Sequence, residues 1–177
     1  MEVKLDVKPL WTPWRMPYIL AIKSHDGCVF CDEVLADGRN PDLVICRGRT
    51  AFVLLNLYPY TTGHLMVVPY RHIPSMVDLS AEELAESTSL LQTAESVLEE
   101  EYGMRAHHVG VNIGHCAGAG VEGHLHIHLV PRGRDDAILP PDGTHDGPAE
   151  PLAVTKDRLA LAWHRSTRYV LHHSSET

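Results

Sequence analysis

The feature that most constrains this chain is the run His-Leu-His-Ile-His-Leu at residues 124–129, where imidazoles and apolar side chains alternate strictly. Period-two alternation predicts a β-strand, because successive side chains of a strand point to opposite faces of the sheet. We therefore expect a strand over 124–131, with Leu125, Ile127 and Leu129 packed into the core. The opposite face carries the three imidazoles, roughly 7 Å apart along the strand. That face must be solvated or line a cleft.

The rest of the chain predicts a small antiparallel sheet and one long helix around this strand. Branched and aromatic residues predict strands at 44–48, 50–60, 64–72 and 106–114. A helix is predicted over 80–103, because Ser80 and Glu83 have the spacing of a capping box and Gly103 provides a stop. Helical spacing of apolar residues supports it at Leu84, Leu90, Leu91, Ala94, Val97 and Leu98.

A second helix is predicted over 153–171, as a C-terminal helical extension. The fold class is therefore α+β, an antiparallel sheet of about five strands with one long helix and this extension. The 177 residues suit one domain with a modest extension.

Composition limits the compartment and the partners. The chain has no run of the ~18 apolar residues that a membrane span needs, and its N-terminus lacks the apolar block of a signal peptide. We therefore expect a cytoplasmic protein. The formal net charge of −8 argues against a nucleic-acid polymer or a membrane surface as partner, since both require a positive field. A small phosphorylated substrate, recognised locally, is compatible with this charge.

The residues alone leave three interpretations of the histidine row open. In the first, all three rings bind one metal ion, as in three-histidine zinc hydrolases. In the second, one ring is a nucleophile toward phosphorus and a neighbour fixes its tautomer. In the third, the row is exposed and has no chemical role. The glycine-rich stretch directly before it, "GHCAGAGVEG", favours phosphate chemistry, because its backbone N–H groups can cradle phosphate oxygens.

Cys28 and Cys31 form a C-x-x-C pair, which in a reducing compartment is typical of metal binding or redox chemistry. A tetrahedral zinc ion needs two further ligands. Cys46 and Cys116 are isolated, so histidines must complete such a site. The alternatives are a packed cysteine pair without metal, or a redox pair, for which the usual thioredoxin-like surroundings are missing.

A family resemblance emerges when several segments are taken together. The run "HLHIHLVPR" resembles the His-x-His-x-His signature of the histidine-triad (HIT) superfamily of nucleotide hydrolases and transferases. With "LWTPWRM", "LNLYPYTTGHLMVVPYRHI" and "GVNIGHCAGAGVEG", the match covers about residues 9–132 and is similar to the bacterial branch related to diadenosine tetraphosphate phosphorylases. It implies a HIT-like fold, with the HIT domain, N-terminal arm and zinc segment in residues 1–135 and an extension in 136–177.

The resemblance also implies a mechanism. His126 attacks the α-phosphorus of a nucleotide such as a dinucleoside polyphosphate and forms a nucleotidyl-histidine intermediate, which water or inorganic phosphate then releases. His128 contacts phosphate oxygens or the leaving group, and His64, which follows Gly63, completes the catalytic set. The resemblance further implies a small nucleotide as partner and a homodimeric assembly.

The remaining implied site residues fall into two groups. The substrate-binding positions are Asn56 at the ribose, Asn112 near phosphate, and the loop residues Gly118, Ala119 and Gly120. A structural Zn²⁺, with no organic cofactor, is implied on Cys28, Cys31, His72 and His124. Two other functions stay open at this point: a nucleotide-binding sensor or interaction protein with little turnover, and a three-histidine zinc hydrolase.

Overall fold

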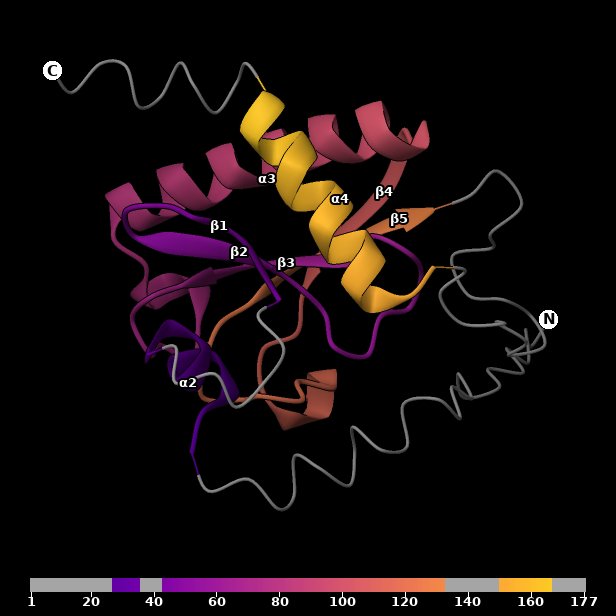
Figure 1. Ribbon diagram of the computed structural model, residues 1–177. Helices are drawn as coiled ribbons and strands as arrows, with labels where there is room; N and C mark the ends of the chain where they lie inside the picture. The colour runs from indigo at the N-terminus through magenta and orange to yellow at the C-terminus, as the bar shows by residue number, and fades with distance from the viewer. Residues whose placement is uncertain (1–26, 36–42, 133–149, 167–177) are drawn as a thin grey trace, which may run out of the picture.

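The computed structural model describes residues 27–35, 43–132 and 150–166 (Figure 1). The predicted N-terminal arm and the end of the predicted C-terminal helix lie outside these residues. The helices and strands are α2 (Val29–Leu35), β1 (Val44–Arg47), β2 (Ala51–Leu55), β3 (Leu65–Pro69), α3 (Ala81–Tyr102), β4 (Ala106–Val111), β5 (Ile127–Arg132) and α4 (Leu152–Arg165). Two 3₁₀ turns are η2 (Met76–Asp78) and η3 (His115–Ala117).

The strands form one five-stranded sheet in the order β1-β2-β3-β5-β4, and every neighbouring pair is antiparallel. This confirms the predicted α+β class. The triad strand β5 lies between β3 and β4, where His128 is opposite Met66 on one side and Gly110 on the other. The strand that carries His128 is therefore hydrogen-bonded to a neighbour on each side.

Helices cover both faces of this sheet. In Figure 1, α3 and α4 lie over one face, and α2 lies on the opposite side. All five residues of β2 are buried, and they alternate between two clusters: Ala51, Val53 and Leu55 join the core under α3 and α4, while Phe52 and Leu54 pack near Phe30 of α2. Each fully buried Val, Leu or Phe side chain stabilises the fold by about 1.5–3 kcal/mol relative to an exposed one.

The C-terminal helix α4 belongs to the main core. Leu159, Ala162 and Trp163 are buried together with residues of α3 and of the sheet. At the start of α4, the Glu150 carboxylate accepts hydrogen bonds from Tyr102 of α3 at 2.7 Å and from Thr155 at 2.8 Å. The predicted second helix is thus present from residue 152 to 165.

Both predicted ends of the long helix are observed in α3. The Ser80 hydroxyl accepts the Glu83 N–H and the Glu83 carboxylate accepts the Ser80 N–H, which completes the capping box. Gly103 ends the helix in the left-handed region, at φ 65°. Leu84 belongs to the apolar pattern that predicts this helix, but its side chain is 46% exposed. Glu83 and Ser87 occupy the inward positions of the first two turns instead.

The strands are shorter than the sequence pattern predicts. The second and third end at Leu55 and Pro69, and the triad strand begins at Ile127 rather than at residue 124. β3 ends at Pro69 because proline has no N–H group that could continue the hydrogen-bond ladder. Before β5, the Leu125 N–H donates to the Ile73 carbonyl at 2.6 Å, outside the sheet. The segments next to these strand ends carry Asn56, His72, His124 and His126, whereas His128 lies within β5.

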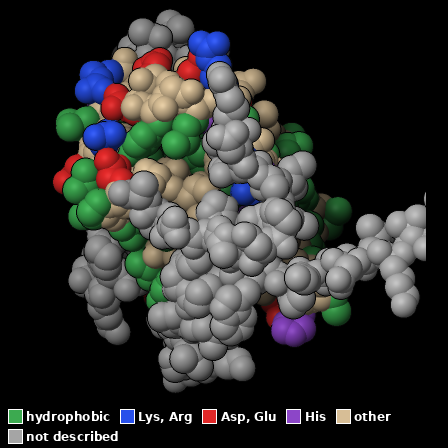
Figure 2. All heavy atoms as spheres, turned by 90° about the vertical axis from the view of Figure 1, so that its right-hand side faces the viewer, with side chains coloured by type: hydrophobic (Ala, Val, Ile, Leu, Met, Phe, Trp, Pro, Cys, Tyr) green, Lys and Arg blue, Asp and Glu red, His purple; other side chains and the backbone are tan. Residues whose placement is uncertain are grey.

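Two further features concern the described helices and the distribution of surface charge. None of the described helices has the length and apolar character needed to cross a membrane. On the face shown in Figure 2, the acidic and basic side chains of the described residues are interspersed rather than gathered into a basic patch.

Candidate functional site

The three triad histidines differ in burial. His124 and His126 lie just before β5 and are 0% and 4% exposed, whereas His128 is half-buried. Of the two expectations for this face, solvation or the lining of a cleft, solvation does not hold for these two rings. Phe30 of α2 covers both, with its ring centroid 5.4 Å from that of His124 and 5.0 Å from that of His126. The alternate residues Leu125, Ile127 and Leu129 are buried as predicted.

The tautomer of His126 follows from its hydrogen bond. Its Nδ1 lies 2.8 Å from the backbone carbonyl oxygen of His124, so the Nδ1–H donates and the lone pair of the neutral ring is on Nε2. Burial lowers the pKa of His126, and this outweighs the carbonyl hydrogen bond, which raises it. A neutral imidazole with a lone pair on Nε2 is the nucleophilic form of histidine.

His64 is wholly buried and is held by the turn that precedes it. Gly63 has φ 79°, a conformation in which any other side chain is strained, and a Cβ atom there would also displace Leu98 Cδ2, which would lie 2.7 Å away. The Tyr60 N–H donates to His64 Nδ1 at 3.2 Å. The proton of the neutral His64 ring is therefore on Nε2.

His64 in turn fixes the tautomer of His128. The proton on His64 Nε2 is donated to His128 Nδ1, 3.0 Å away. In a neutral ring, His128 then carries its own proton on Nε2. That N–H is suited to a phosphate oxygen or to an oxygen leaving group. The structure thus brings His64 and His128 together, and the rings of His126 and His128 lie 4.9 Å apart.

Of the two predicted asparagines, the structure brings Asn56 to the histidines. It follows β2, is 7% exposed, and its Oδ1 accepts the Tyr58 N–H at 3.0 Å. Its Nδ2 lies 3.4 Å from His64 Nε2. Since both of these nitrogens carry protons, we do not assign this contact as a hydrogen bond. Asn112 is exposed directly after β4, and no hydrogen bond joins it to the triad within the described residues.

The glycine-rich loop uses part of its hydrogen-bonding capacity internally. The Gly118 N–H donates to the His115 carbonyl at 2.9 Å, and the Ala119 N–H donates to the Gly114 carbonyl at 3.4 Å. For Gly120, no such bond is found in the part of the chain that the structure describes. Of the three predicted backbone donors, only the Gly120 N–H lacks an internal hydrogen bond among the described residues.

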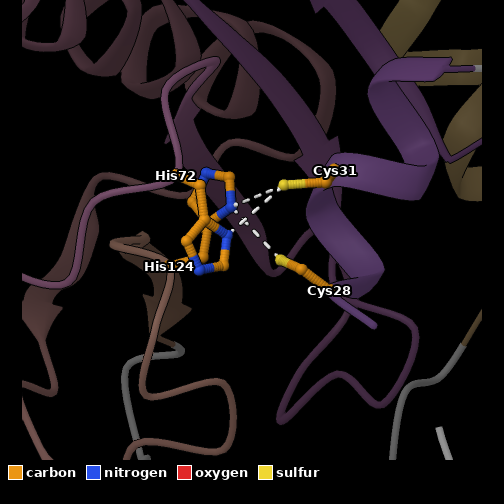
Figure 3. A group of neighbouring side chains, drawn as sticks. All are labelled: Cys28, Cys31, His72 and His124. Carbon is orange, nitrogen blue, oxygen red and sulfur yellow. Dashed lines mark hydrogen bonds between the residues drawn. The ribbon is translucent and has the colours of Figure 1, made fainter. Parts of the chain in front are cut away.

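The four predicted metal ligands meet at one point (Figure 3). One donor atom each from Cys28, Cys31, His72 and His124 lies within 4.8 Å of all the others. Cys28 Sγ is 3.2 Å from His124 Nδ1, and Cys31 Sγ is 3.4 Å from His72 Nδ1. Ligands of a tetrahedral zinc ion with Zn–S of about 2.3 Å and Zn–N of about 2.0–2.1 Å are separated by about 3.5 Å. The donor set therefore fits zinc.

The surroundings of this group prepare it for a metal. His124 Nε2–H donates to the Pro69 carbonyl at 2.8 Å, which directs Nδ1 and its lone pair toward the cysteines. A Cβ atom on Gly123 would lie 3.0 Å from His72 Nε2, so glycine allows the close approach of that ring. Among the described residues, this is the only group with metal-ligand spacing, and it contains neither His126 nor His128. The geometry disfavours a three-histidine metal site.

Sequence reasoning missed several contributors to this site. Phe30 lies between the two cysteines, and its place against the imidazoles depends on how α2 packs on the sheet. Tyr60 acts through its backbone N–H, which no side-chain pattern reveals. His115 contacts the Glu122 carboxylate at 2.9 Å across the glycine-rich loop. This contact directs the one acidic side chain of that loop toward an imidazole.

Comparisons with known proteins identify relatives of this chain. A family model described as the HIT domain matches residues 37–135. The AP-4-A phosphorylase of Mycobacterium tuberculosis is 35% identical over 168 residues, which cover 90% of this chain and 86% of that protein. The asymmetrical bis(5'-nucleosyl)-tetraphosphatase of Schizosaccharomyces pombe is 31% identical over 93 residues, or 52% of this chain and 50% of the relative.

The fold has close structural counterparts as well. A Zn-bound histidine triad family protein from Mycobacterium smegmatis has a TM-score of 0.64 and 24% sequence identity. The superposition covers 78% of this chain and 94% of that protein. At this identity the likeness is one of fold.

Proposed function

The chain belongs to the HIT domain family, and on this premise we propose that it is a nucleotide hydrolase or nucleotidyltransferase that acts on dinucleoside polyphosphates. The relatives named for such substrates support this activity. The observation that carries the assignment to a residue is the hydrogen bond from His126 Nδ1–H to the His124 carbonyl. It leaves the Nε2 lone pair of a buried, neutral ring for attack.

In the first step, His126 Nε2 attacks the α-phosphorus of the substrate. A P–N bond forms as the bond from that phosphorus to the bridging oxygen breaks, and the bridging oxygen leaves with the electron pair. The Nε2–H of His128, held in this tautomer by His64, donates to the leaving oxygen or to a phosphate oxygen. Asn56 binds the ribose, and the Gly120 N–H supports a phosphate oxygen. Asn112, Gly118 and Ala119 stay predictions for the phosphate end.

In the second step, an acceptor oxygen attacks the same phosphorus and the P–N bond breaks, which restores neutral His126. With water as acceptor the product is a nucleoside monophosphate, and with inorganic phosphate it is a nucleoside diphosphate. The 35% identity to an AP-4-A phosphorylase supports phosphate as the acceptor.

We also propose a structural Zn²⁺ on Cys28, Cys31, His72 and His124. Three sulfur–nitrogen separations of 3.2–3.5 Å, the clustering of all four donor atoms within 4.8 Å and the orientation of His124 support it. When bound, zinc supplies a cross-link between α2, the loop after β3 and the segment before β5, and no chemistry on phosphorus. The Cys28-x-x-Cys31 pair is thus interpreted as metal-binding rather than redox-active.

The experiment that tests this function is product analysis. Diadenosine tetraphosphate is incubated with the full chain, with and without inorganic phosphate, and nucleotides are separated by chromatography. We expect ATP and ADP when phosphate is present, and ATP with AMP if water is the acceptor. Tight nucleotide binding with no product under either condition, and none from other dinucleoside polyphosphates or nucleoside phosphoramidates, contradicts the proposal and favours a sensor.

The remaining expectations belong to the same proposal. We propose a cytoplasmic homodimer in which residues 1–135 form the HIT domain with its arm and zinc segment, and residues 136–177 form an extension. The burial of Leu159, Ala162 and Trp163 in the main core indicates that the extension stabilises the HIT domain. Light scattering of the full chain tests the dimer.

A further inference from the structure

The four metal ligands differ in how they are held in place. His124 is buried and oriented by its own hydrogen bond to the Pro69 carbonyl. Cys28 and Cys31 are linked through the first turn of α2, where the Asp32 N–H donates to the Cys28 carbonyl at 3.0 Å. His72 is exposed, and within the described residues its ring makes no hydrogen bond other than that to Cys31. Its position must be set by the backbone that carries it.

That backbone is fixed on both sides of His72. On one side, Arg71 Nε and Nη2 each donate a hydrogen bond to a different oxygen of the Glu83 carboxylate, both at 2.6 Å. Arg71 Nη2 also donates to the Asp78 carbonyl at 2.7 Å. On the other side, the Ile73 carbonyl accepts the Leu125 N–H at 2.6 Å. The loop is thus attached to the N-terminus of α3 and to the segment that carries His124.

Glu83 is suited to be the fixed end of this attachment. It is 5% exposed and belongs to the capping box of α3, which restricts its rotamers. Its hydrogen bonds with Arg71, together with those from Ser80, lower the pKa of Glu83 to about 2 against the effect of burial. A two-pronged guanidinium–carboxylate pair constrains direction as well as distance, which a single-point charge contact does not.

We propose that the Arg71–Glu83 pair is the positioning element of the metal centre, which holds His72 within reach of the ion and thereby raises the affinity for zinc. This inference rests on the proposed zinc site. It assigns Glu83 a second role beyond the helix cap. Partners that orient metal ligands typically contribute 10–100-fold in metal affinity.

The test is a zinc-affinity measurement on the full chain by competition with a chromophoric chelator. For Glu83→Gln we expect the zinc dissociation constant to rise by about 10–100-fold. The amide retains the capping interaction but cannot form the two-pronged ion pair. Arg71→Lys, which keeps the charge and loses the fork, should show a similar loss and provides a second variant if the first folds poorly.

Ser80→Ala is the matched control. It removes the serine half of the same capping box and destabilises the fold by about 1 kcal/mol, yet leaves Arg71 and Glu83 paired. We expect its zinc affinity to equal that of the wild type. Substitution with Co²⁺ adds a spectroscopic measurement: the intense tetrahedral visible bands should weaken in Glu83→Gln and in His72→Ala, but not in Ser80→Ala.

The outcomes separate the two proposals. Wild-type affinity in both Glu83→Gln and Arg71→Lys overturns the positioning role, and so does an equal loss in Ser80→Ala, because general destabilisation then explains it. If the wild type and Cys28→Ser bind zinc equally weakly, the zinc site itself is wrong and the positioning role falls with it. The product analysis above is unaffected by that result.

Discussion

His124 and His126 are two residues apart, yet the structure prepares them for different chemistry. Each donates one ring N–H to a backbone carbonyl, but His124 uses Nε2 toward Pro69 and His126 uses Nδ1 toward His124. The free lone pair is therefore on Nδ1 in the first ring and on Nε2 in the second. The Nδ1 lone pair of His124 faces two cysteines and suits a metal ion, whereas the Nε2 lone pair of His126 suits attack on phosphorus. The nearest carbonyl, rather than the residue type, decides the role.

The metal group and the proposed nucleophile His126 both lie next to Phe30. Its ring packs against both imidazoles, and the cysteines on either side of it in sequence belong to the metal group. Loading of the metal centre and shielding of the nucleophile therefore depend on the same short helix, α2. The two sites can nevertheless be tested separately, because a change in the metal group should leave a measurable property of the His126 site intact, and the reverse.

The largest expected effect is that of His126→Ala. Loss of the nucleophile should reduce kcat on diadenosine tetraphosphate by at least about 10³-fold. Zinc content, measured by elemental analysis, should stay at the wild-type level because His126 is outside the metal group. In His126→Gly, added imidazole should restore part of the activity. Near-normal turnover in His126→Ala contradicts the assignment.

A double variant, Cys28→Ser with Cys31→Ser, disrupts the metal group. We expect zinc to fall below one tenth of the wild-type content, since two of the four ligands are lost. Turnover should fall by roughly 10-fold rather than vanish, because the metal holds α2 in place and takes no part in the chemistry on phosphorus. Full zinc occupancy with intact activity would favour a metal on the three triad histidines.

His64→Phe tests the residue that fixes the tautomer of His128. A phenyl ring preserves the stacking on Tyr60, which has ring centroids 5.2 Å apart, but removes the proton given to His128. We expect kcat to fall by about 10–100-fold with a smaller change in KM, since general-acid assistance is weakened. The matched control is Tyr60→Phe, which keeps the ring and the backbone N–H. Equal losses in both variants would argue against the tautomer role.

The smallest predicted effect concerns stability and pH. The pKa of Glu83 is about 2 in the folded protein and near 4.5 when unfolded, so the ionised carboxylate stabilises the fold above pH 4.5. In metal-free protein, Glu83→Gln should lower the free energy of unfolding at pH 7 by about 1–2 kcal/mol. That difference should shrink as the pH falls from 4.5 toward 2. Urea denaturation at several pH values measures it, and a difference independent of pH would contradict the ion pair.

The strict alternation of Leu125, Ile127 and Leu129 with histidine predicts which side of the triad segment packs into the core. It does not predict that His124 and His126 are buried as well. The sequence also predicts the two ends of α3. Other features depend on long-range contacts. The carbonyl that orients His124 is contributed by Pro69, and the burial of His126 depends on Phe30, so neither appears in a local pattern. His72 entered the ligand set only through family resemblance, and Glu83 could be identified only as a cap.

The central claim is that neighbouring imidazoles hold opposite tautomers, and ¹⁵N NMR of histidine-labelled, zinc-loaded protein tests it most directly. With resonances assigned through single His→Gln variants, we predict that His126 is neutral at pH 7.5 with its proton on Nδ1. His124 should carry its proton on Nε2, with Nδ1 shifted by the metal. A His126 ring protonated on Nε2, or one whose nitrogen shifts change when zinc is replaced by cadmium as a direct ligand's would, contradicts the account.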